Sequence, residues 1–83
     1  MALQTPLTFR DRKMDAAYIM VPSVTIEKDA YILAKVRVYA TALDRRNNLP
    51  PVDEFSFQLP YSDTPFAAVF VALRQKYPNA TNV

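Results

Sequence analysis

The chain has 83 residues, no cysteine, no histidine and no glycine, and a net charge of +2 from 10 basic and 8 acidic residues. The missing cysteine excludes disulfides and thiolate metal sites, and the missing histidine removes the commonest metal ligand and general base. Phosphate-binding loops of the P-loop and dinucleotide types need glycine, so both are excluded. We therefore expect no enzyme, no cofactor and no metal site.

The size of the chain limits how stable it can be alone. A domain this small buries only about 60–65% of its unfolded surface, so we expect a homo-oligomer or symmetric assembly to supply further stability. The charges are interspersed, which is typical of an ordinary soluble surface rather than of one that binds nucleic acid or anionic membrane. Neither a signal peptide nor a membrane span is recognisable, so we expect a cytoplasmic location.

Two strands are predicted in the first third of the chain. Alternating apolar and polar residues predict a short strand over 5–10, followed by a charged, solvated turn at 10–13. A second strand is predicted over 16–27. Within it, Pro22 and Ser23 indicate a bulge or bend at which the buried face of the strand switches.

The longest clean alternation predicts a strand over 31–42. Its even positions, from Ile32 to Ala40, are apolar, whereas its odd positions from Lys35 onward are charged, aromatic or hydroxylic. Because successive side chains on a strand point to opposite faces, this strand should have one dry face and one presented face. The short step at 28–29 predicts a tight antiparallel hairpin with the preceding strand.

The second half of the chain predicts a loop, a strand, a helix and a tail. Residues 44–51 contain two asparagines that tolerate positive φ and two prolines that stop regular structure, which predicts a loop. Alternation resumes in a strand over 53–59. A helix is predicted over 65–76, with Thr64 as N-cap and an apolar stripe. Residues 78–83 are expected to be a polar tail. The stripe comprises Phe66, Val69, Phe70, Leu73 and Tyr77.

These elements predict a single α+β domain over 1–83. We expect an antiparallel β-meander of about four strands with one C-terminal helix packed on one face, so the other face is left uncovered. Tyrosine and arginine are enriched at protein interfaces, which favours a protein partner over nucleic acid for that face. The candidate protein-interaction residues are Tyr31, Lys35, Arg37, Tyr39, Arg45 and Arg46.

Short motifs near both ends of the chain carry a resemblance. Residues 16–21 read Ala-Ala-Tyr-Ile-Met-Val, and residues 64–83 begin Thr-Pro-Phe and end Ala-Thr-Asn-Val. They resemble a group of small proteins from the structural-gene modules of tailed bacteriophages. That group has an Ala-Tyr-x-x-Val strand and a terminal Pro-Phe-x-x-Ala-(Tyr/Phe)-x-x-Leu-Lys segment followed by Ala-Thr-Asp. The chain departs from the group where the group often has glycine, as at Asn79.

The resemblance implies a non-enzymatic structural or assembly protein of the virion. It suggests a multi-copy tail, baseplate or neck accessory, with other virion proteins as partners and the host cytoplasm as the place of assembly. A capsid-associated decoration protein is an alternative. An alternative of another class is a small nucleic-acid-binding or regulatory protein that uses Lys35, Arg37, Arg45 and Arg46.

Overall fold

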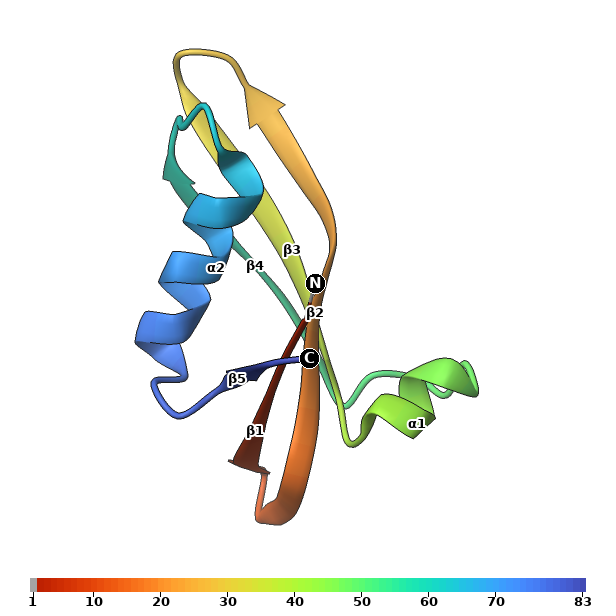
Figure 1. Ribbon diagram of the computed structural model, residues 1–83. Coiled ribbons are helices and arrows are strands. Elements are labelled where there is room, and N and C mark those ends of the chain that lie inside the picture. The colour runs from red at the N-terminus through yellow and green to blue at the C-terminus, as the bar shows by residue number, and fades with distance from the viewer. Residues whose placement is uncertain (1) are drawn as a thin grey trace.

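The computed structural model describes residues 2–83, which form a five-stranded antiparallel sheet and two helices (Figure 1). The strand order across the sheet is β4-β3-β2-β1-β5. The α+β class is confirmed, but one strand and one helix more than predicted are present. The elements are β1 (Ala2–Phe9), β2 (Arg12–Glu27), β3 (Tyr31–Tyr39), α1 (Ala42–Arg46), β4 (Asp53–Pro60), α2 (Pro65–Lys76) and β5 (Thr81–Asn82).

The long strand β2 belongs to both halves of the sheet. Its first half pairs with β1 and its second half with β3. Asp15 and Ala16 lie together opposite Pro6, and Val21 and Pro22 lie together opposite one residue of β3. Each extra residue moves the following side chains to the other face, so the buried parity of β2 switches twice. The bulge predicted beside Pro22 is confirmed. β2 starts at Arg12 rather than at residue 16, because residues 12–14 pair with β1, and the first bulge interrupts the alternation between this part and the rest of the strand.

Four turn residues take the left-handed backbone that glycine usually supplies. Arg10 and Asp11, with φ of 49° and 65°, form the two-residue turn between β1 and β2. Asp29 has φ of 62° and lies in the turn between β2 and β3, which has three residues instead of the predicted two. Asn48, with φ of 60°, is the fourth. Aspartate and asparagine tolerate this conformation best, which explains how the chain turns without glycine.

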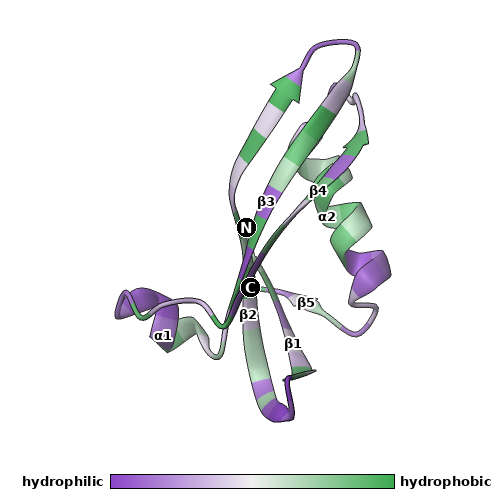
Figure 2. Cartoon of the chain, turned by 180° about the vertical axis from the view of Figure 1, so that it is seen from behind, coloured by the Kyte–Doolittle hydropathy of each residue, from purple (hydrophilic) through white to green (hydrophobic). Residues whose placement is uncertain are grey.

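The hydrophobic core lies between α2 and one face of the sheet, which we call the covered face. The even positions of β3 are buried there, as the alternation predicted. Figure 2 shows an apolar stretch in the first half of that strand and polar residues between apolar ones farther along it. Three residues of α2 pack onto them at helical spacing. The buried residues of the two elements are Ile32, Ala34, Val36, Val38, Val69, Phe70 and Leu73.

The first residue of the predicted helical stripe is an exception. Phe66 is 53% exposed, so its predicted place in the core is wrong. Phe66 is the second residue of α2, and helical side chains lean toward the N-terminus, which is the direction away from the buried residues Val69, Phe70 and Leu73. Val71, which lies off the stripe, is 56% exposed.

Several predicted boundaries are also wrong. β1 begins at Ala2 rather than residue 5, and β3 ends at Tyr39 rather than residue 42, because Thr41 starts a helix. The predicted polar tail contains β5, which extends the sheet beside β1. The Val83 N–H also donates to the Ala2 carbonyl at 3.0 Å.

Candidate interaction surface

Helix α1 spans the end of the predicted strand and the first part of the predicted loop, residues 44–46. The Thr41 hydroxyl caps its start by accepting from the Asp44 N–H at 3.1 Å. At its end, the Leu49 N–H donates to the Asp44 carbonyl at 3.0 Å and the Asn48 N–H to the Arg45 carbonyl at 3.1 Å. These two bonds form a Schellman motif, with Asn48 in the place that glycine usually takes. The spacing of Thr41 and Asp44 was a sequence signal for this helix that the loop prediction missed.

The second face of the sheet, which we call the open face, is covered at one end by α1 and the segment after it. Tyr39 is only 7% exposed, so its predicted role on a free surface is wrong. It lines a hollow of about 340 Å³ together with Met20, Arg37, Arg45 and residues 48–51. The Arg45 Nε–H donates to the Met20 sulfur at 3.1 Å, which ties α1 to β2.

The two basic residues at the centre of the open face share one carboxylate. Lys35 Nζ lies 3.0 Å from Glu54 Oε1, and Arg37 Nε lies 3.0 Å from Glu54 Oε2. The register of β3 and β4 places Arg37 directly opposite Glu54. Hydrogen bonds from Lys35 and then Arg37 lower the pKa of Glu54, and the bond to Glu54 raises the pKa of Arg37. Two cations therefore share one negative charge within the chain, which leaves a charge of +1 on this group of three residues.

One further pKa shift lies on the covered face. Tyr77 follows the last residue of α2 and packs against the core. Burial raises the pKa of Tyr77, and the negative charge of Asp53 raises it further. Asp53 therefore acts on the covered face while its neighbour Glu54 acts on the open face, as adjacent strand positions should.

Replacing Glu54 by glutamine should make the domain less sensitive to acid. A carboxyl group whose pKa is lower in the folded state contributes stability above its unfolded pKa, and that stability is lost as pH falls through the folded value. The wild-type protein should therefore lose more stability than Glu54→Gln between about pH 5 and pH 3. Thermal unfolding across this range checks the result, with exposed Glu27→Gln as control. Equal acid sensitivity of Glu54→Gln and wild type would contradict a stabilising role for the contacts of Glu54 with Lys35 and Arg37.

The six candidate residues do not form one continuous site. Tyr31 and Tyr39 stand at opposite ends of β3, about 26 Å apart. Lys35 and Arg37 lie between them, bound to Glu54. The structure brings Arg37, Tyr39 and Arg45 together at the hollow, and Arg46 is exposed in the last turn of α1.

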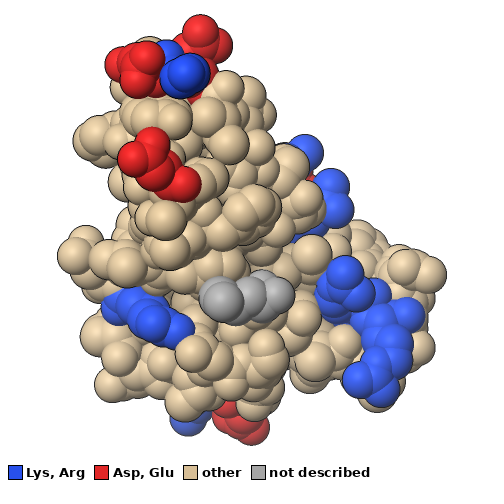
Figure 3. All heavy atoms as spheres, turned by 45° about the horizontal axis from the view of Figure 1, so that its top comes forward, with Lys and Arg blue, Asp and Glu red and all other residues tan. Residues whose placement is uncertain are grey.

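Sequence reasoning missed two apolar residues of this region. Leu43 in α1 and Leu49 after it are 57% and 49% exposed. They flank Arg45 and Arg46 along the chain, so leucine and arginine side chains are exposed on one short segment. Figure 3 shows basic side chains gathered at the α1 end of the molecule and acidic ones at the β2–β3 turn. We call Leu43, Arg45, Arg46 and Leu49 the α1 surface.

Two further findings concern the described part of the chain. No three His, Cys, Asp or Glu side chains of residues 2–83 come together as a metal site would require. Neither of the two helices is long and apolar enough to cross a bilayer. Comparison with protein-family models, with curated proteins and with solved structures found no match to this chain.

Proposed function

We propose that the protein is a non-enzymatic structural or assembly component of a tailed-phage virion, present in many copies as a tail, baseplate or neck accessory. The proposal rests on the resemblance of the protein's short motifs to those of phage structural proteins and on the chemistry of its surface. In such an assembly, copies and neighbouring virion proteins bury the surface that an 83-residue chain leaves exposed. The protein would then be found in the virion.

The α1 surface is the observation that carries the proposal. Arginine is enriched at protein interfaces and among their hot spots, and exposed apolar side chains gain free energy when a partner buries them. Leu43 and Leu49 are exposed beside Arg45 and Arg46, and the capped ends of α1 hold this segment in one conformation. A preorganised segment loses less conformational entropy on binding than a flexible loop, which favours its use as a docking surface.

The charge distribution supports a protein partner over nucleic acid. Binding to a phosphate backbone depends on basic groups that are free to replace counterions. Lys35 and Arg37 are both engaged with Glu54, and the net charge of the chain is only +2. Two of the four basic residues expected to bind nucleic acid are therefore paired within the protein.

Mass spectrometry of purified phage particles tests the proposal directly. The chain should be present at a copy number that is stoichiometric with a ring or other symmetric part of the virion. Absence from the particles would overturn the proposal. Titration with single-stranded DNA and RNA tests the alternative, since tight binding that weakens steeply with salt would favour a nucleic-acid-binding protein.

Reversing the charge of the α1 surface should reduce incorporation into particles. The double variant Arg45→Glu/Arg46→Glu replaces two interface-type cations by anions, and we expect a loss of about tenfold or more in incorporation. The matched control is Arg12→Glu/Lys13→Glu, an equal charge change at exposed positions of β2 near the β1–β2 turn. Circular dichroism should show both variants folded. Equal incorporation of the two variants would contradict a role for the α1 surface.

A further inference from the structure

Strand β4 leaves a whole edge of the sheet unpaired in the described residues. It stands at the end of the strand order, and its eight residues pair with β3 only. Every second residue of an edge strand turns its N–H and C=O groups outward, where they can bond to another strand. The register with β3 runs without a bulge from Tyr31↔Pro60 to Val38↔Asp53, so the edge is regular along its full length.

The other open edges of this sheet carry features that discourage pairing. The part of β2 beyond β1 contains Pro22 and a bulge, and the part of β1 beyond β5 contains Pro6. Proline and bulges are common protections of edge strands, as is lysine. β5 has only two residues. β4 has no lysine and no bulge, its one proline, Pro60, is its last residue, and its two charged residues, Asp53 and Glu54, are confined to its first two positions.

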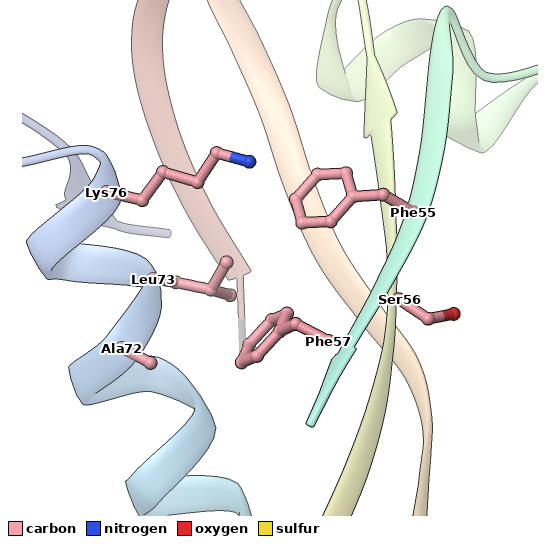
Figure 4. Close-up of a pocket in the computed structure, with 6 residues that line it drawn as sticks. All are labelled: Phe55, Ser56, Phe57, Ala72, Leu73 and Lys76. Carbon is pink, nitrogen blue, oxygen red and sulfur yellow. The ribbon is translucent and has the colours of Figure 1, made fainter. Parts of the chain in front are cut away.

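An apolar hollow lies next to this unprotected edge. It has a volume of about 240 Å³ and lies between β4 and α2. Figure 4 shows Phe55 and Phe57 pointing from β4 toward Leu73, with the Lys76 chain reaching over and Ser56 turned to the opposite side. The Lys76 ammonium lies 4.0 Å from the centre of the Phe55 ring. Both phenylalanines are only half-buried, so this end of the core is incomplete.

We propose that β4 pairs antiparallel with β4 of a second copy, joining two sheets into one across a two-fold axis. In antiparallel pairs, facing residues share a sheet face, so the axis passes through a residue position, and the full length of β4 overlaps best when that position is one of the two central ones, Ser56 or Phe57. With the axis at Ser56, Phe55 faces the partner's Phe57. With the axis at Phe57, Phe55 faces the partner's Leu59. Both registers place apolar side chains together on the covered faces and place no like charges opposite one another.

This pairing gives partners both to the backbone groups of β4 and to its half-buried apolar side chains. The outward backbone groups of β4 gain hydrogen bonds, and Phe55 and Phe57 gain apolar neighbours beside the hollow in both registers. The chain needs added burial because a single core of this size is marginal. The inference deepens the proposed multi-copy role and rests on it for its biological meaning, but the contact itself is tested in purified protein.

Charge substitution at the edge tests the pairing. Ser56 and Gln58 are exposed on the open face, and Ser56 lies opposite Lys35, so Ser56→Glu/Gln58→Glu should leave the monomer folded. In both registers it places like charges opposite one another across the axis. We expect analytical ultracentrifugation to show a dimer for the wild type and a dimer dissociation constant raised at least about tenfold for the variant. Mixing it with Ser56→Lys/Gln58→Lys should restore mixed dimers.

The absence of native cysteine allows a direct check of the register. Directly facing antiparallel residues have the Cα separation that a disulfide needs. Under oxidation, Ser56→Cys alone should crosslink if the axis is at Ser56, whereas an equal mixture of Ser56→Cys and Gln58→Cys should crosslink between its two variants if the axis is at Phe57. Ser23→Cys, exposed on β2, is the control and should stay monomeric.

A monomeric wild type, a dimer unaffected by the Glu substitutions, or crosslinking of Ser23→Cys alone would overturn the β4 pairing. These results are independent of the particle experiment. A chain present in particles without a β4 dimer contradicts only the pairing, and a β4 dimer of a chain absent from particles contradicts only the virion role.

Discussion

Val36→Asp should unfold the domain. Val36 has 0% of its surface exposed and lies in the middle of β3, under α2. An aspartate there either carries an uncompensated buried charge or takes up a proton at a cost, and either cost is several kcal/mol. Folded proteins are stable by only about 0.05–0.15 kcal/mol per residue, so little or no stability should remain in a domain of this size. Circular dichroism should show loss of the sheet signal at 25 °C.

The matched control for that experiment lies on the same strand. Leu33 points to the open face and is 38% exposed, so Leu33→Asp keeps its charge in contact with water. We expect this variant to stay folded, with a small shift in its unfolding midpoint. A folded Val36→Asp, or equal losses in the two variants, would contradict the assignment of the two faces of the sheet.

Leu73→Ala should have the second-largest effect. Leu73 is 1% exposed, belongs to the buried row of α2 and lines the hollow beside β4. Truncating a buried leucine to alanine costs about 2–5 kcal/mol, because transfer free energy is lost and a cavity remains. Because Leu73 already borders a hollow, we expect the neighbouring side chains to fill little of the new cavity. Urea unfolding should show a midpoint far below that of the wild type.

Val71→Ala provides the comparison within the same helix. Val71 is 56% exposed, and alanine has the higher helix propensity, so this variant should unfold close to the wild-type midpoint. Similar losses for Leu73→Ala and Val71→Ala would mean that α2 does not pack onto the sheet with the face described here. Because Val71 is exposed, it is free to contact other chains.

The parts of the fold that were predictable depend on local periodicity. β3, β4 and α2 each carry a repeat of 2 or 3.6 residues over most of their length, and their limits were close to those found. β2 was harder, because two bulges interrupt its repeat and only one of them is marked by an internal proline. β5 has two residues and no repeat, so only its pairing with Leu3 and Gln4 defines it.

For the candidate surface, too, local periodicity was predictable from the sequence and contacts between distant segments were not. The alternation of β3 correctly assigned Lys35 and Arg37 to the face away from α2. It could not show that Glu54, 17 residues after Arg37, would bind both cations, since this depends on the register of β3 and β4. Nor could it show that α1 and residues 48–51 would fold back over Tyr39. Both outcomes depend on contacts between segments distant in the sequence.

By itself, the amino-acid sequence determined the class of the fold, the two faces of β3 and the absence of cysteine and histidine chemistry. These follow from side-chain alternation and from composition. Alternation is a property of one segment at a time, and composition carries no information about how the strands are arranged. Only the tertiary structure decided the strand order, the burial of Tyr39, the sharing of Glu54 by Lys35 and Arg37, and the unpaired edge of β4. An edge is defined by which strands are missing beside it, and no single segment of sequence carries that information.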